Sequence, residues 1–146
     1  MKKKIITLVA FVMLAVTTTF AGGNDISKNA LVTFSGAFAK ATDVKWEKEA
    51  TYYKASFKMN GQSLNALLSE EGDMIAVSRN ILSTELPIRL QASLNKNFSA
   101  YWISELTEYA VGDSTLYYIT LENADQKTMF ESVGMYDWSL LKKTTK

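Results

Sequence analysis

The chain repeats a pattern of residues at a constant spacing, and this internal repeat constrains the fold more than any other feature. After an insertion of about eight residues in the second copy, the match continues through a segment rich in alternating apolar residues. Self-similarity over a few tens of residues is the signature of repeated supersecondary units. We therefore expect an α+β fold, a tandem repeat of a helix plus an antiparallel four-stranded sheet, over about 27–82 and 83–142. The aligned pairs, first at an offset of 56 residues and then of 64, are Phe34 with Leu90, Phe38 with Leu94, Lys40 with Lys96, Val44 with Ala100, Trp46 with Trp102, Tyr53 with Tyr117, Ala55 with Ile119, Phe57 with Leu121 and Gln62 with Gln126.

The first 21 residues have the pattern of a cleavable signal peptide. Three lysines at positions 2–4 precede an apolar run over 5–16, and the small residues Thr19 and Ala21 stand at positions −3 and −1 of a cleavage site. A helix of about 12 apolar residues rises only about 18 Å, less than the roughly 30 Å of a bilayer core, which disfavours a membrane anchor. We expect cleavage after Ala21 and no membrane span afterwards. Because no cysteine follows the run, the chain is not expected to be a lipoprotein.

The composition of the expected mature chain, residues 22–146, narrows its class. Removing the three lysines of the signal peptide leaves 13 basic and 15 acidic side chains, a formal charge of −2. A duplex-binding protein needs a basic stripe, so nucleic acid is not an expected partner. The chain has no cysteine, so a single domain of this length would rely on its core and not on disulfides. We expect a periplasmic or secreted protein.

Apolar spacing predicts a helix at the start of the first unit. Leu31, Phe34 and Phe38 follow the i, i+3, i+7 pattern of one helix face. The hydroxyl of Ser27 is placed to cap the free amides of the first turn. Gly36 weakens the helix, because glycine costs about 1 kcal/mol relative to alanine in a helix interior.

From residue 43 the apolar period changes to two, which predicts half-buried strands. Val44 and Trp46 are expected to point inward, as are alternate residues over 53–59. Asn60-Gly61 is typical of a type I′ hairpin turn, so the chain should return antiparallel over 62–69 and, after a turn at residues 71–72, supply a further strand over 74–78. The residues expected on the core face of the returning strand are Leu64, Ala66 and Leu68.

The second unit is expected to start with a helix from Ser83 to about Lys96. Thr84 would cap it and Pro87 would occupy its first turn, where no amide hydrogen is needed. Strands should follow near 99–107, 114–122, 126–133 and 136–142, with an inserted, longer hairpin over 108–114. Trp46 and Trp102 are expected to occupy equivalent core positions. The likewise inward side chains are Tyr117, Ile119, Leu121, Phe130, Trp138 and Leu140.

The order of these features resembles the PepSY-like, beta-lactamase-inhibitor-protein-like domain of exported proteins in Bacteroides-type bacteria. The residues that carry the resemblance are Val44-Lys45-Trp46, Tyr53-Lys54-Ala55-Ser56-Phe57, Asn60-Gly61, Glu71-Gly72-Asp73 and Leu86-Pro87. The resemblance implies helix-plus-antiparallel-sheet units and, in relatives, a sheet face that grips another protein. The second unit departs from the family pattern, because its hairpin dipeptide is Ala124-Asp125. The resemblance therefore does not imply that this chain inhibits a beta-lactamase.

The residues needed for common catalytic mechanisms are missing. The chain has no histidine and no cysteine, and Ser27 is explained by helix capping. Glu70, Glu71 and Asp73 crowd one turn, but their spacing matches no known calcium loop and acidic turns are usually solvated. We expect no enzyme activity, no cofactor and no metal.

The remaining signal for function comes from aromatic residues whose strand positions alternate with those of the expected core residues. If helices cover one side of the sheet, these residues point to the uncovered side, where tyrosines often anchor protein partners. We expect a non-catalytic protein-binding or inhibitor-like module whose partner is an envelope or secreted protein. The alternative is a carrier or sensor of a small apolar ligand or cell-envelope fragment held between helices and sheet. The expected partner-binding residues are Tyr52, Tyr101, Tyr118 and Met129 on the strands and Tyr109 and Tyr136 in loops.

Overall fold

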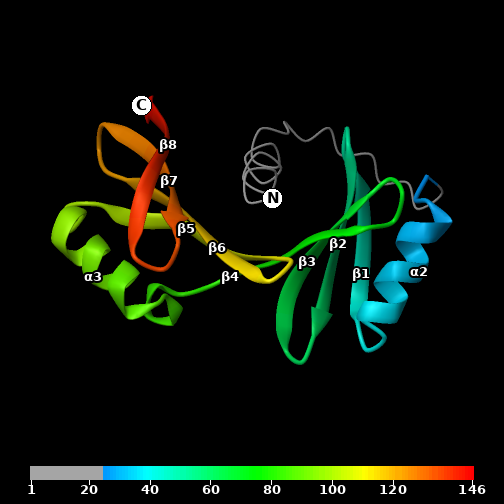
Figure 1. Cartoon of the computed structure of the whole chain (residues 1–146). Coiled ribbons are helices and arrows are strands. Elements are labelled where there is room, and N and C mark those ends of the chain that lie inside the picture. Colours follow the sequence, from blue (N-terminus) through cyan, green and yellow to red (C-terminus); the bar gives the residue numbers. More distant parts are fainter. Residues whose placement is uncertain (1–24) are drawn as a thin grey trace. The chain divides into compact units, whose positions relative to one another are not determined.

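The computed structural model describes residues 25–146, which form two α-helices, one short 3-10 helix and eight strands (Figure 1). The strands are hydrogen-bonded in sequence order, β1 to β8, and every pair whose register is defined is antiparallel. The expected α+β class is therefore confirmed. The predicted signal peptide and its cleavage site lie outside the described residues. Within the described residues, no helix is long and apolar enough to cross a membrane.

The chain divides into two compact units, with the boundary between Val77 and Ser78, inside β4 (Met74–Asn80). In the first unit, α2 (Lys28–Ala37) starts after Ser27, whose hydroxyl accepts a hydrogen bond from the Ala30 amide at 3.2 Å. The predicted cap is thus confirmed. The buried face of α2 carries Ala30 and Phe34, whereas Leu31, expected to point inward, is exposed.

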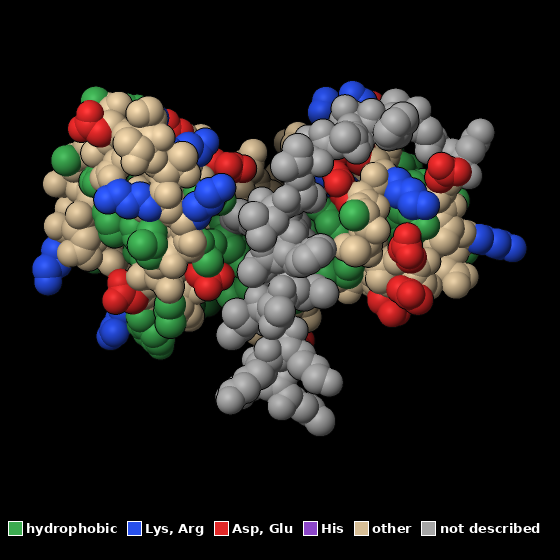
Figure 2. Space-filling view, turned by 90° about the horizontal axis from the view of Figure 1, so that it is seen from above, with side chains coloured by type: hydrophobic (Ala, Val, Ile, Leu, Met, Phe, Trp, Pro, Cys, Tyr) green, Lys and Arg blue, Asp and Glu red, His purple; other side chains and the backbone are tan. Residues whose placement is uncertain are grey.

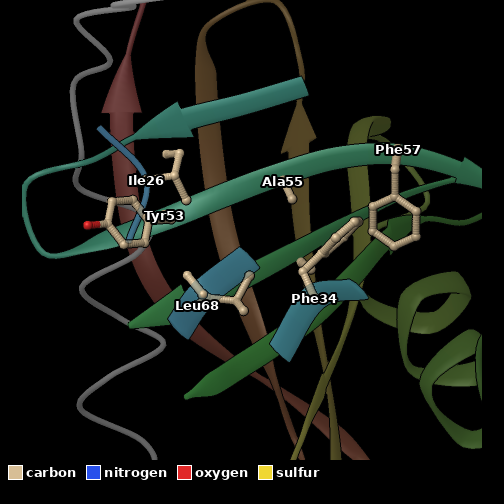
Figure 3. Close-up of a cluster of buried hydrophobic side chains, with 8 residues drawn as sticks. Ile26, Phe34, Tyr53, Ala55, Phe57 and Leu68 are labelled. Carbon is tan, nitrogen blue, oxygen red and sulfur yellow. The ribbon is translucent and has the colours of Figure 1, made fainter. Parts of the chain in front are cut away.

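The strands of the first unit are β1 (Thr42–Lys48), β2 (Tyr52–Met59) and β3 (Gln62–Ser69), followed by the start of β4. Asn60 and Gly61 both have positive φ, 52° and 75°, as the predicted type I′ turn requires. The core of this unit forms where α2 lies on the sheet, and Figure 3 shows its labelled side chains gathered on one side of the strands. These side chains are Ile26, Phe34, Tyr53, Ala55, Phe57 and Leu68.

The turn between β3 and β4 lies against α2. Gly72 has φ of +98° and is buried. A Cβ atom built there would lie 2.6 Å from the Asn29 Cβ atom and 2.7 Å from the Asn29 carbonyl carbon. Only glycine therefore fits this turn without displacing the helix.

The second unit begins with a 3-10 turn, η1 (Ser83–Glu85), and then α3 (Ile88–Asn97). The predicted continuous helix is interrupted because the backbone is extended at Leu86 and Pro87. Thr84 is not the cap: the Glu85 carboxylate accepts a hydrogen bond from the Leu82 amide at 2.7 Å.

Four strands complete the second unit: β5 (Trp102–Val111), β6 (Ser114–Glu122), β7 (Gln126–Val133) and β8 (Asp137–Thr145). The predicted long hairpin over 108–114 is wrong, because β5 continues to Val111 and a turn at Gly112-Asp113 joins it directly to β6. The insertion of about eight residues in the second copy therefore lengthens the strands and not the loop. The core under α3 consists of Ile81, Leu86, Leu90, Leu94, Leu106, Tyr117, Ile119 and Leu121.

Register shifts interrupt the strand alternation at three places. In β1 the register shifts between Thr42 and Lys45, with Asp43 at φ 54°, and Val44 is exposed rather than inward. In β5 the register shifts between Ile103 and Glu105. A third shift lies between Met129 and Phe130, in the pairing of β7 with β8. Such bulges add one unpaired residue and flip the alternation beyond it.

The β5 bulge overturns the expectation for Trp102. Ile103 and Leu106 pair with the core residues Leu121 and Ile119, so Trp102 lies on the other side of the sheet and is 52% exposed. Leu140, also expected in the core, is exposed as well.

Trp46, in contrast, packs against the core of the first unit, in edge contact with Phe34 at 5.1 Å between ring centroids. The two tryptophans are therefore not equivalent.

Candidate functional site

We call the side of β5–β8 opposite α3 the helix-free face of the second unit. Its members are defined by strand register, because they alternate with the side chains that pack under α3. The face mixes aromatic, aliphatic, acidic and basic side chains. The members include Trp102, Glu105, Thr107 and Tyr109 on β5, Leu116, Tyr118, Thr120 and Glu122 on β6, Lys127, Met129 and Glu131 on β7, and Ser139, Lys142 and Thr144 on β8.

Trp102 stands at one end of this face with ion pairs around it. The Lys146 ammonium nitrogen lies 4.8 Å from the centre of the Trp102 ring and 2.8 Å from the Glu122 carboxylate. Lys127 approaches the same carboxylate at 3.6 Å. The hydrogen bond from Lys146, with a further one from Ser104, lowers the pKa of Glu122 to about 2. The indole is thus held by charged neighbours while half of its surface stays open to solvent.

A second aromatic group on this face is packed more tightly. Tyr118 is 3% exposed, and its ring lies 5.3 Å from that of Tyr109 in an edge-on contact. Its hydroxyl donates a hydrogen bond to the Glu131 carboxylate at 3.2 Å. Burial, followed by the Glu131 charge, raises the pKa of Tyr118. Burial also raises the pKa of Tyr109, which lies in β5 and not in the loop expected for it.

The residues expected to bind a partner fall into different environments. Tyr52 and Tyr118 are buried, so the expectation of open rings is wrong for both, although Tyr118 lies on the predicted side of the sheet. Tyr101 lies on the α3 side, beside Phe98, because the β5 bulge reverses its parity. Met129 is half-buried on the helix-free face, as its parity predicts.

Tyr136 is 64% exposed in the turn between β7 and β8, as expected for a loop. The Arg89 guanidinium carbon lies 5.0 Å from the centre of its ring, which ties the turn to α3. Sequence reasoning missed Trp102 as a surface residue, because its match to Trp46 placed it in the core. No local signal in the sequence marks the bulge that exposes it.

On the α3 side, the second unit has a hollow of about 450 Å³ between η1, α3 and the start of β5. Polar and apolar residues line it in equal measure. The alternative hypothesis names a small apolar ligand or a cell-envelope fragment, and of these two a purely apolar ligand does not match the lining. A smaller hollow of about 170 Å³ lies beyond Phe98 and Tyr101, which border both. The lining residues of the larger hollow are Ser83, Thr84, Gln91, Leu94, Asn95, Phe98, Ser99, Tyr101, Ile103 and Leu121.

Charged side chains form structural pairs in the second unit. Arg79 contacts Glu108 at 2.8 Å and Glu85 at 3.2 Å, which joins β4, β5 and η1. Figure 2 shows basic and acidic side chains interspersed on the visible face of each unit, with no field of one sign. Over residues 25–146 no group of three metal-ligating side chains is found, and this range includes the acidic turn after β3.

Comparison with known proteins identifies the fold. No protein-family model matches the chain, and no curated protein matches it. A DUF2874 family protein from Bacteroides ovatus has a TM-score of 0.73 and 20% identity, over 84% of this chain and 89% of that chain. A BLIP-like protein from Bacteroides fragilis has a TM-score of 0.69 and 16% identity, over 85% of this chain and 89% of that chain.

A candidate periplasmic protein from Bacteroides eggerthii has a TM-score of 0.72 and 14% identity, over 82% of this chain and 88% of that chain. The chain therefore has the fold of these three Bacteroides proteins, one of which is BLIP-like. Identities this low show a common fold and leave the function of the chain to be argued from its own residues.

Proposed function

We propose that this protein is an exported, non-catalytic module that binds another protein through the helix-free face of its second unit. The observation that carries the proposal is Trp102, a large aromatic residue that is 52% exposed on a strand. Tryptophan and tyrosine dominate the energetics of protein interfaces, because they bury much area at little cost in side-chain entropy. The likeness to BLIP-like proteins adds support at the level of fold only.

The surroundings of Trp102 favour binding by a preformed surface. Lys146 holds the indole from one side, and the Tyr118–Glu131 hydrogen bond and the Tyr109 ring fix the centre of the face. Fixed side chains lose little freedom when a partner docks, so more of the contact energy remains as affinity. Mixed charges around an aromatic anchor are typical of the rim of an interface.

The two units differ at the position of this anchor. We propose that they are copies of one helix-plus-strands repeat whose helices begin 60 residues apart, at Lys28 and Ile88, and not 56. The turn after each helix supports this, because the amides of Phe38 and Phe98 bond to carbonyls four residues back in the same way, at 2.8 and 2.9 Å. In this alignment Thr42 stands where the second unit has Trp102.

The proposal includes the processing and location of the chain. A signal peptide over 1–21, cleaved after Ala21, would deliver residues 22–146 to the periplasm or the exterior. The similarity to a candidate periplasmic protein supports this location. The partner would then be an envelope or secreted protein.

A capture experiment with matched variants tests the proposal. Mature protein is immobilised, envelope extracts are passed over it, and bound polypeptides are quantified by mass spectrometry. Trp102→Ala should reduce capture of the partner more than about tenfold, as expected for an interface anchor. Ile88→Ala is the control, because Ile88 is 76% exposed but lies on α3, away from the helix-free face.

Both variants change exposed positions, so their melting curves should overlay that of the wild type. Equal capture by all three proteins would contradict the role of the helix-free face. The proposal would also be refuted if no polypeptide were captured in a saturable way.

A further inference from the structure

The larger hollow on the α3 side has a lining that specifies the chemistry of a ligand. It is formed by η1, α3, the turn into β5 and the side chains of Ile103 on β5 and Leu121 on β6. Two hydrogen bonds hold that turn in place. The Phe98 amide donates to the Leu94 carbonyl, and the Tyr101 amide donates to the Phe98 carbonyl. A volume of about 450 Å³ lies within the usual range of small-molecule sites.

Charge excludes one class of ligand. None of the ten lining residues is Asp, Glu, Lys or Arg, although charged residues make up 21% of the chain. A ligand with a formal charge would lose hydration on entry and find no opposite charge to compensate. The lining therefore suits an uncharged ligand.

The polar side chains exclude a second class. The Gln91 amide nitrogen donates to the Thr84 and Leu86 carbonyls at 3.2 and 2.8 Å, which holds its oxygen in place as an acceptor. The Tyr101 hydroxyl accepts a hydrogen bond from Gln126, which borders the smaller hollow. Within the described chain, the exposed Asn95 amide makes no hydrogen bond. A purely apolar ligand would shield these groups from water without offering them a hydrogen bond, which costs free energy for each group.

We propose that this hollow binds a neutral saccharide unit. A sugar ring carries several hydroxyls, which match the amide groups of Asn95 and Gln91 and the hydroxyl of Ser99. It also has a face of C–H bonds, which matches the apolar wall of the hollow. That wall is formed by Leu94, Phe98, Ile103 and Leu121. The proposal concerns the α3 side of the unit and does not rest on protein binding at the helix-free face.

Titration with defined probes, followed by ¹H–¹⁵N correlation spectra, tests this assignment. The probes are glucose, galactose, mannose and N-acetylglucosamine, each up to about 50 mM. At least one should shift the amide signals of Asn95, Ser99 and Tyr101 in a saturable way. Glucuronate and glucosamine are the charged comparisons and cyclohexanol is the apolar one, and all three should bind at least about tenfold more weakly.

Two substitutions in the same helix distinguish binding in the hollow from a general effect of changing the protein surface. Asn95→Ala should weaken binding about fivefold, as expected for one lost hydrogen bond. Asn97→Ala should not, because Asn97 is exposed on the same turn but bonds to Ser93 and does not line the hollow.

Three results would overturn the proposal. The first is the absence of saturable shifts with every neutral sugar, and the second is equal or tighter binding of a charged or apolar probe. The third is an equal loss of affinity in both variants.

Discussion

Replacing Gly72 with alanine should destabilise the first unit more than any other glycine substitution in it. Two costs add at this position. At φ of +98° an L-residue is strained, which costs of order 1 to 3 kcal/mol. The new Cβ atom would also overlap Asn29 at 2.6 Å, and forcing apart a packed contact of this kind costs typically 1 to 3 kcal/mol.

The sum, about 2 to 6 kcal/mol, is a large share of the roughly 5 to 15 kcal/mol that stabilises a typical domain. The Asn29 contact includes a backbone atom, so a rotamer change cannot relieve it. The helix must instead move away from the turn. The loss should therefore appear as separation of α2 from the sheet.

Two other glycines provide controls that separate strain from overlap. Gly61 also has positive φ, but a Cβ atom there would meet nothing within 4 Å, so Gly61→Ala should cost only about 1 to 2 kcal/mol. Gly36 lies in α2 with open space around it, and Gly36→Ala should stabilise by about 0.5 to 1 kcal/mol.

Urea unfolding followed by far-UV circular dichroism measures all three changes in the free energy of unfolding. The reasoning is refuted if Gly72→Ala costs no more than Gly61→Ala. That result would mean that the turn shifts freely and that α2 is not held by it.

Two pH-dependent predictions follow from groups on the helix-free face. The pKa of Glu122 is lowered to about 2, chiefly by Lys146, so its contribution to stability is present above about pH 4.5 and is lost as the pH falls toward 2. Glu122→Gln should flatten the acid side of a plot of urea midpoint against pH, and an unchanged slope between these values would contradict the pairing. The pKa of Tyr118 is raised, so the folded state keeps its proton above pH 10 while the unfolded chain loses it. Stability should therefore fall above about pH 10, and Tyr118→Phe should make that fall shallower, measured in the same way; an equally steep fall would show that other groups cause it.

Several strands could be predicted from the sequence because the signals that define them are local. The bounds predicted for β3, β6 and β7, namely 62–69, 114–122 and 126–133, agree with the structure. Each combines period-two alternation with a nearby turn, and at Asn60-Gly61 the turn type itself follows from the dipeptide. Such signals do not depend on distant parts of the chain.

The orientation of Trp102 could not be predicted for a physical reason. Parity counting assumes that alternation is unbroken, but the β5 bulge puts Trp102 and Glu105 on one side and Ile103 and Leu106 on the other. Matching Trp102 to Trp46 by residue identity then placed it in the core. A bulge is stabilised by the register of the neighbouring strand, which the local sequence does not specify.

The burial of Tyr118 could not be predicted from the sequence for a different reason. Its side of the sheet follows from parity, but its exposure depends on Tyr109, nine residues away along the chain, and on Glu131 in the next strand. Parity gives the direction of a side chain and not the neighbours that cover it.

The irregularities in β1 and in the pairing of β8 bear on how copies of this protein behave at high concentration. An outermost strand offers a row of free amides and carbonyls, onto which another chain can add as a further strand. The bulge at Asp43 disrupts this row in β1, and the charged residues Lys45 and Lys48 follow it along the strand. In β8 the irregularity is followed by Lys142 and Lys143. Both outer strands therefore disfavour edge-to-edge pairing between molecules.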